Sequence, residues 1–111
     1  MEAVLWYVLT GTRGGPNRIR ILRAVEDRPR NANQLAELLE LDYSTIRHHM
    51  DVLTEHGIVT RTGGEYGAVY SLTTEARHNW ELIEEIETEL SRQTHTARRE
   101  TNDRLDRCST H

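Results

Sequence analysis

Residues 31–59, with the sequence NANQLAELLELDYSTIRHHMDVLTEHGIV, decide the fold. This stretch holds two short segments whose apolar residues recur at helical spacing, separated by a tight turn. Asn31 and Gln34 form a capping-box-like pair that predicts the start of the first helix. Asp42 is a favoured N-cap residue and predicts the start of the second helix, which Gly57 ends. Two helices joined by so short a turn are typical of a helix-turn-helix.

The second of these helices, about residues 43–56, has a predictable inward side. Ile46, Met50 and Leu53 recur at intervals of four and three residues and should face the core. The exposed N-terminal side then carries Tyr43, Ser44, Thr45, Arg47 and His48. Arginine can hold a guanine edge with two parallel hydrogen bonds, and a helix N-terminus favours phosphate, so these five residues are candidates for contact with duplex DNA. The simpler interpretation makes Arg47 a solvated charge.

A β-hairpin is expected directly after the helix pair. Residues 58–62 and 68–72 are rich in Val, Ile, Thr and Tyr, and they flank a glycine-rich loop. We expect a wing over about residues 58–72. Arg61 and Tyr66 could place a cation and a phenol against phosphates or the minor groove, although an ordinary exposed hairpin explains them almost as well.

Two further helices are expected before the helix pair. Residues 2–10 form a short and strongly apolar helix candidate that Gly11 closes. The next helix should begin with Gly15 as its cap and Pro16 at its first helical position, and Pro29 should stop it. The predicted order is therefore helix, helix, short helix, turn, helix, hairpin and helix. This order defines a mainly α fold with a β-hairpin wing (α+β), a winged helix-turn-helix.

A last helix is predicted after Thr73, with an apolar stripe on one side and acidic residues on much of the other. Combined with the apolar residues of the first helix, this stripe is larger than one small core needs, and exposed patches of that kind usually meet a partner. The candidate dimerisation residues are Leu5, Trp6, Leu9, Trp80, Ile83, Ile86 and Leu90. A two-fold homodimer would present two recognition helices roughly 34 Å apart, so its DNA target should be an imperfect palindrome.

Charge is distributed unevenly along the chain. The formal net charge of -4 argues at first against nucleic acid. Residues 11–30, however, hold six arginines against two acidic residues, whereas residues 74–89 hold six acidic residues against one arginine. An acidic helix can point away from DNA while the arginine-rich part faces it. Arg18 is the candidate backbone contact in that part, whereas Arg20 and Arg23 could equally pair with local acids.

Composition points to one domain with a polar appendage. Residues 1–91 carry the apolar clusters, whereas residues 92–111 have little to bury and are expected to be disordered or a frayed helical extension. Cys108 has no partner for a disulfide or a thiolate metal site, which fits a reducing cytoplasm. The apolar run near the N-terminus follows Glu2 and is too short to span a bilayer, so we expect neither secretion nor membrane insertion.

With these elements in place, residues 31–59 resemble the DNA-binding core of ArsR-type regulators, with the closest likeness to the archaeal branch. The resemblance extends through residues 5–7, 11–22 and 66–70, and so covers roughly residues 3–90. It implies a homodimer joined through the first and last helices, with the fourth helix in the major groove and the wing beside the DNA backbone. It implies repression or activation without indicating which.

Metal sensing is not implied by this resemblance. Where metal-sensing members carry a cysteine pair in the third helix, this chain has the sequence LELD at residues 39–42. A metal-sensing alternative would use His78, Glu81 or Glu85 with His95 across a dimer, because imidazole and carboxylate can bind zinc. That spacing is nonspecific, and solvated side chains explain it more simply. We therefore expect no metal and no cofactor.

Two alternatives from other functional classes remain. An enzyme finds little support, because residues 11–15 are not a phosphate-binding loop, Ser44 lacks a nucleophile-elbow setting and no carboxylate pair is placed for acid-base catalysis. The stronger alternative is a winged helix that serves as a protein–protein interaction module in a transcription or regulatory complex. The effect of removing the Arg47 side chain on DNA binding and on dimerisation separates this alternative from a DNA reader.

Overall fold

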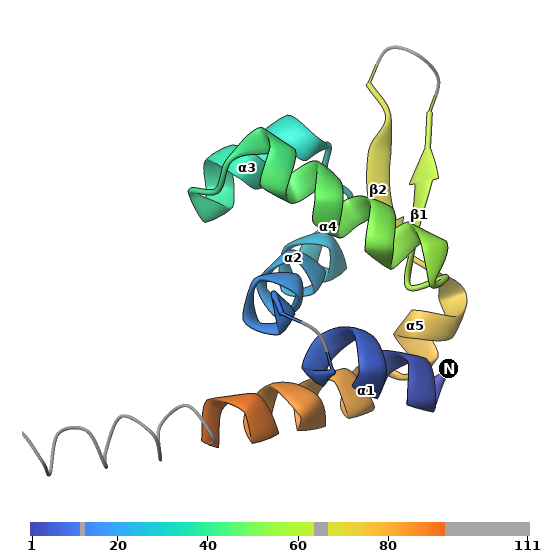
Figure 1. Cartoon of the computed structure of the whole chain (residues 1–111). Helices are drawn as coiled ribbons and strands as arrows, with labels where there is room; N and C mark the ends of the chain where they lie inside the picture. The colour runs from blue at the N-terminus through green and yellow to red at the C-terminus, as the bar shows by residue number, and fades with distance from the viewer. Residues whose placement is uncertain (12, 64–66, 93–111) are drawn as a thin grey trace, which may run out of the picture.

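The chain is a series of helices interrupted by one β-hairpin (Figure 1). A computed structural model describes residues 1–11, 13–63 and 67–92. The elements are α1 (Glu2–Thr10), α2 (Gly15–Asp27), α3 (Ala32–Leu39), α4 (Tyr43–Glu55), β1 (Val59–Thr62), β2 (Val69–Leu72), α5 (Thr74–His78) and a helix over residues 80–92, named here the C-terminal helix. The helix α4 and the hairpin lie at one end of the molecule, and α1 and the C-terminal helix lie at the other. Within these described segments, no helix has the length and apolar character needed to cross a membrane.

The predicted helix-turn-helix is confirmed in its main features. The Asn31 side chain accepts a hydrogen bond from the Gln34 backbone at 2.7 Å, and the Gln34 side chain accepts one from the Asn31 backbone at 2.8 Å. This capping box starts α3. The turn passes through Glu40, whose φ of 57° is left-handed. Asp42 occupies the N-cap position of α4, but its side chain makes no capping hydrogen bond.

The corner between α1 and α2 has no room for a side chain at Gly14 or Gly15. The helix α2 starts at Gly15, one residue earlier than expected, after a left-handed Gly14 with φ of 91°. A Cβ atom on Gly14 would lie 2.6 Å from Cε1 of His49, and one on Gly15 would lie 2.0 Å from the Leu9 carbonyl oxygen. Glycine at both positions therefore lets the backbone of α2 approach α1 and α4 closely.

The hairpin is fastened at its base to the rest of the domain. The strands β1 and β2 pair antiparallel, with Val59 opposite Leu72 and Thr62 opposite Val69. Backbone hydrogen bonds of 3.1 and 2.8 Å also join Arg30 to Tyr70, so the segment after α2 adds one bridge to the two-stranded sheet. The hairpin thereby lies beside α4, with β1 packed against that helix.

The single helix predicted after Thr73 is instead two helices, with a break at Asn79. The Asn79 side-chain amide donates to the Glu75 carbonyl, four residues back, at 2.9 Å. Its backbone N–H donates instead to the Ala76 carbonyl, three residues back, at 3.1 Å. Asparagine competes in this way with the regular helical hydrogen bond to residue i−4 and so favours a turn. The C-terminal helix therefore runs in a different direction from α5 (Figure 1).

Four of the seven predicted dimerisation residues lie inside the core of one protomer, which corrects the sequence interpretation. Leu5, Leu9 and Ile86 are fully buried, and Ile83 is 1% exposed. The stripe that looked surplus in the sequence is thus largely used in the protomer. Trp6, Trp80 and Leu90 remain partly exposed.

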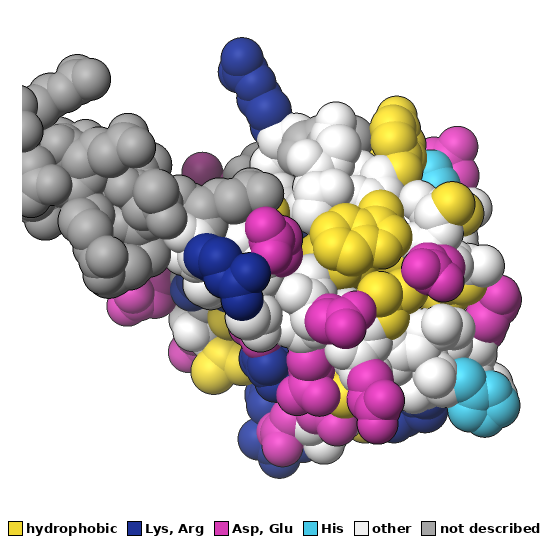
Figure 2. Space-filling view, turned by 90° about the horizontal axis from the view of Figure 1, so that it is seen from below, with side chains coloured by type: hydrophobic (Ala, Val, Ile, Leu, Met, Phe, Trp, Pro, Cys, Tyr) yellow, Lys and Arg dark blue, Asp and Glu magenta, His cyan; other side chains and the backbone are white. Residues whose placement is uncertain are grey.

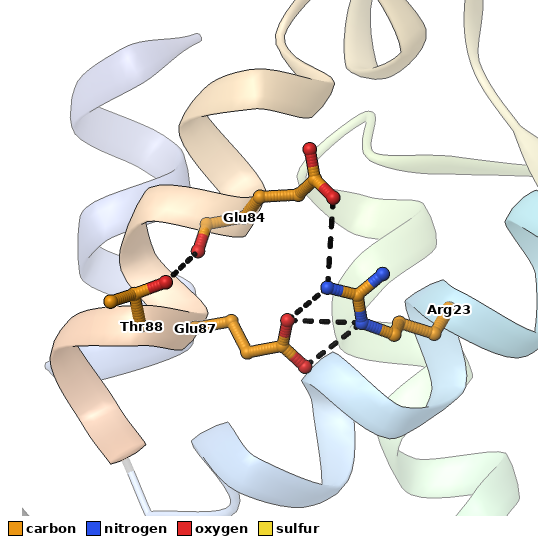
Figure 3. A network of polar contacts seen from close by, with 4 residues as sticks. All are labelled: Arg23, Glu84, Glu87 and Thr88. Atoms are coloured by element: carbon orange, nitrogen blue, oxygen red, sulfur yellow. Dashed lines mark hydrogen bonds and ion pairs between the residues drawn. The ribbon is translucent and has the colours of Figure 1, made fainter. Parts of the chain in front are cut away.

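An arginine of α2 contacts two acidic residues of the C-terminal helix (Figure 3). The Arg23 Nε atom donates to both carboxylate oxygens of Glu87, at 3.0 and 2.9 Å, and one Nη atom lies 3.7 Å from a Glu84 oxygen. The guanidinium also lies 5.8 Å from the ring centre of Trp80. The sequence offers Arg23 the local acids of α2 as partners, whereas the observed partners, Glu87 and Glu84, are more than sixty residues away.

Candidate nucleic-acid interface

The helix α4 presents the exposed face that its apolar spacing predicts. Ile46, Met50 and Leu53 are fully buried, which confirms the predicted inward side. On the outward side, Ser44 and His48 are exposed, Tyr43 is 47% exposed and Thr45 is half-buried. The adjacent His49 is 6% exposed, as expected of a residue about 100° around the helix from His48. The N-terminal half of α4 is therefore a polar surface on an apolar base.

Arg47 is held against its own helix. Its Nη1 atom donates to the Tyr43 hydroxyl oxygen over 3.3 Å, and this hydrogen bond raises the pKa of Arg47 above its ordinary value. The Nε atom is buried and has no hydrogen-bond partner among the residues that the structure describes. The guanidinium is thus a permanent cation, with its Nε atom buried and one of its two terminal nitrogen atoms held by Tyr43.

Arg18 does not belong to the surface, which corrects its prediction as a DNA contact. It is 4% exposed. Its Nη1 atom donates to the Val8 carbonyl of α1 at 3.0 Å, and its Nε atom donates to Nδ1 of His49 on α4 at 3.1 Å. A buried guanidinium needs such partners to offset its loss of hydration, and burial lowers the pKa of Arg18. Arg18 therefore joins three helices and cannot also reach a phosphate.

The contact with Arg18 defines the state of His49. Because Nδ1 accepts the hydrogen bond from an arginine, it carries no proton, and the ring is neutral with its proton on Nε2. Burial, the Arg18 cation and the neighbouring His48 lower the pKa of His49. The sequence contained no signal for this pair, because its members lie 31 residues apart.

The wing contributes one described candidate to the same end of the molecule. Arg61, on β1, is exposed and forms no ion pair with another of the described residues. Tyr66 lies outside the described residues. The hairpin projects beyond α4 at the end of the molecule away from α1 (Figure 1). The wing and the polar side of α4 are therefore available at one end of the fold.

The remaining polar candidates have structural partners or no shared site. Arg20 donates to the Leu39 carbonyl at 2.8 Å and thereby covers the end of α3. Over residues 1–11, 13–63 and 67–92, no cluster of three or more His, Cys, Asp and Glu side chains is arranged to hold a metal ion. His78, Glu81 and Glu85 therefore form no such cluster there, and His95 lies outside the described residues.

The opposite end of the molecule has a different surface. Figure 2 shows apolar side chains near the centre of this face with acidic side chains around them. Tyr7 of α1 is 58% exposed, and Trp6, Trp80, Leu82 and Leu90 are partly exposed at the surface of the core. This end presents apolar area among acidic and some basic side chains, whereas the α4 end presents hydroxyl, imidazole and guanidinium groups.

Comparison with known proteins supports this description of the fold. A family model described as a helix-turn-helix domain matches residues 15–62. No curated protein sequence matches the chain. Among solved structures, reduced HlyU from Vibrio cholerae is 24% identical, with a TM-score of 0.59 over 77% of this chain and 87% of that chain.

Two further solved structures of similar fold are described as ArsR-family or ArsR-like regulators. A homodimeric winged helix-turn-helix DNA-binding domain from Mycobacterium bovis, described as a possible ArsR-family transcriptional regulator, is 16% identical, with a TM-score of 0.64 over 78% of each chain. An ArsR-like transcriptional regulator from Rhodococcus is 19% identical, with a TM-score of 0.58 over 88% of this chain and 90% of that chain. The chain therefore has a winged helix-turn-helix fold, and its structural neighbours are transcriptional regulators.

Proposed function

We propose that this chain is a sequence-specific, duplex-DNA-binding transcriptional regulator that acts as a homodimer. Its recognition helix, about residues 43–56, would enter the major groove, and the wing, about residues 58–72, would lie on the DNA backbone. The observation that carries the proposal is the exposed polar face of α4, which the burial of Ile46, Met50 and Leu53 turns outward. The proposed DNA-binding residues are Tyr43, Ser44, Thr45, Arg47, His48, Arg61 and Tyr66.

The distribution of charge in the fold supports this orientation. The acidic C-terminal helix lies at the end away from α4, so its field is directed away from the proposed DNA surface (Figure 1). The helix-turn-helix match over residues 15–62 and the DNA-binding description of the Mycobacterium bovis domain agree with the same proposal. The closer assignment to the archaeal branch of ArsR-type regulators rests on the resemblance of residues 31–59. The proposal includes a cytoplasmic location and no catalytic role.

We further propose that two copies meet through α1 and the C-terminal helix. The residues available for this contact are Trp6, Trp80 and Leu90, together with the exposed Tyr7. The Mycobacterium bovis domain, which has the same fold, is described as homodimeric. Sedimentation equilibrium of the wild-type chain tests the contact, because a monomer at all concentrations and salt levels would contradict it.

The DNA-binding proposal is tested by fluorescence anisotropy. The full chain is titrated into a labelled duplex from upstream of its own gene and into a scrambled duplex, across a potassium chloride series. We expect preference for the upstream duplex, weaker binding at higher salt, and weaker binding by Arg47→Ala. Arg77→Ala is the matched control, because it removes an exposed arginine from α5 at the opposite end.

The outcomes separate the two candidate functions. If Arg47→Ala weakens DNA binding but leaves the oligomeric state unchanged, the side chain acts at the DNA surface. If no duplex binds at any salt concentration, the chain is not a DNA reader and a protein–protein interaction module explains the exposed face of α4. Equal losses in Arg47→Ala and Arg77→Ala would indicate general attraction of DNA to positive charge.

A further inference from the structure

Tyr43 and Arg47 form a pair at the start of the recognition helix. They are four residues apart, so they lie on the same side of α4 one turn from each other. The Arg47 Nη1 atom donates to the Tyr43 hydroxyl oxygen over 3.3 Å. Tyr43 is 47% exposed, so the hydroxyl group lies at the surface proposed to meet DNA. Its own hydrogen remains available to a further acceptor.

The protein restricts which edge of the guanidinium can recognise a base. An arginine can present either its Nε/Nη edge or its terminal Nη1/Nη2 edge to a pair of acceptors. In Arg47 the Nε atom is buried, which removes the first of these edges from solvent. The terminal edge remains, and its orientation is limited by the hydrogen bond from Nη1 to Tyr43.

We propose that Tyr43 is a positioning residue that orients the terminal edge of Arg47 toward a guanine in the major groove, so that the two residues determine base preference at one position. This inference rests on the proposed function. Guanine offers O6 and N7 as a pair of acceptors in the major groove, and a bidentate arginine contact is the commonest way to read them. Tyr43 acts through Arg47, while its free hydroxyl hydrogen is directed to a neighbouring acceptor on the DNA.

The test uses Tyr43→Phe, which removes only the hydroxyl group. Thr54→Val is the matched control, because it removes an exposed hydroxyl from the C-terminal part of the same helix. Wild-type protein first selects preferred duplexes from a randomised pool. Each guanine of the selected duplex is then replaced by 7-deazaguanine, which lacks the N7 acceptor, and dissociation constants are measured for wild type, Tyr43→Phe, Arg47→Ala and the double variant.

We expect 7-deazaguanine at one position of each half-site to weaken wild-type binding by about tenfold. Tyr43→Phe and Arg47→Ala should each remove this sensitivity, and the double variant should bind no more weakly than Arg47→Ala. Thr54→Val should retain the full sensitivity. The thermal unfolding midpoint of Tyr43→Phe should equal that of wild type, because an exposed hydroxyl is removed.

Each failure has a separate meaning. If Tyr43→Phe keeps the 7-deazaguanine sensitivity, or if the losses in the two single variants add in the double variant, Tyr43 does not position Arg47 and this inference is wrong. If no guanine position depends on Arg47, the inference is also wrong although the chain still reads DNA. If wild type selects no sequence from the pool, the proposed function itself fails.

Discussion

The two ends of this molecule use their side chains in opposite ways. At the α4 end, the apolar residues are buried in the core and the polar residues are exposed, as the spacing of Ile46, Met50 and Leu53 predicts. At the end formed by α1 and the C-terminal helix, residues expected on the outside are inside. Helical periodicity identifies the buried side of a helix well, but it does not say whether the residues that cover that side come from the same protomer or from another.

The largest expected effect tests the core assignment at the second end. Ile86→Ala should lower the free energy of unfolding by about 2–5 kcal/mol, because it leaves a cavity at a fully buried site. Leu90→Ala, at a partly exposed position of the same helix, should cost less. Both are measured by chemical denaturation at a protein concentration where the oligomeric state is known. A variant Ile86→Ala that is as stable as wild type but no longer self-associates would return Ile86 to the interface.

The next effect concerns the arginine that connects the two ends. Arg18→Met should destabilise the fold by about 1–3 kcal/mol, because it removes the donor that pairs with the buried Nδ1 atom of His49. Arg20→Met is the control, because Arg20 is exposed and covers only a helix end. Denaturant titration of both variants measures the difference in their free energies of unfolding. Equal values would mean that the hydrogen bonds of the buried Arg18 do not stabilise the fold.

A smaller effect should appear as a pH dependence of stability. The folded-state pKa of His49 is lowered, so the folded protein binds fewer protons there than the unfolded chain. Stability should therefore fall as the pH drops through the ordinary histidine pKa, about 6.5, and this loss is complete below the lowered folded-state pKa. His49→Asn retains an acceptor for Arg18 without titrating and should show a flatter profile between pH 8 and 5. A profile identical to that of wild type would contradict this assignment.

The smallest effect is expected at the surface contact of the C-terminal helix. Arg23→Ala should cost about 1 kcal/mol or less, because its pairs with Glu87 and Glu84 are largely exposed. The hydrogen bond from Arg23 lowers the pKa of Glu87, so the contribution is present above the unfolded-state pKa of Glu and is lost as the pH falls through the folded-state value. Faster amide exchange over residues 80–92 at neutral pH would register the loss, and unchanged exchange would show that the apolar core alone holds this helix.

Local signals predicted most of the fold. The capping box of Asn31 and Gln34, the inward side of α4 and the two strands of the hairpin all follow from neighbouring residues, and all are confirmed. The polar face of α4 follows in turn, because what is not buried is exposed. Its role in DNA binding remains a prediction.

The features that the sequence did not reveal depend either on contacts between distant segments or on local hydrogen bonds that compete with others. Arg18 looked like one of several surface arginines until His49 and Val8 came together around it. The break at Asn79 depends on the side-chain amide of Asn79, which donates to the Glu75 carbonyl in place of its own backbone N–H. The orientation of Arg47 depends on its hydrogen bond to Tyr43 and on the burial of its Nε atom. Spacing along the chain does not predict the contact of Arg18 with His49, and the i,i+4 spacing of the other two pairs permits their hydrogen bonds without requiring them.

The close contacts of Gly14 and Gly15 between α1 and α2 limit how the sequence can evolve at that corner. A side chain at Gly15 would overlap the Leu9 backbone and one at Gly14 would overlap the His49 ring, so substitution at either position should strongly destabilise the fold. Gly57 also has a left-handed backbone, with φ of 73°, but its surroundings are open. Asparagine, which tolerates that conformation, should be accepted at Gly57. Substitution of glycine should thus be tolerated at the end of α4 and rejected at the start of α2, although glycine occupies both turns.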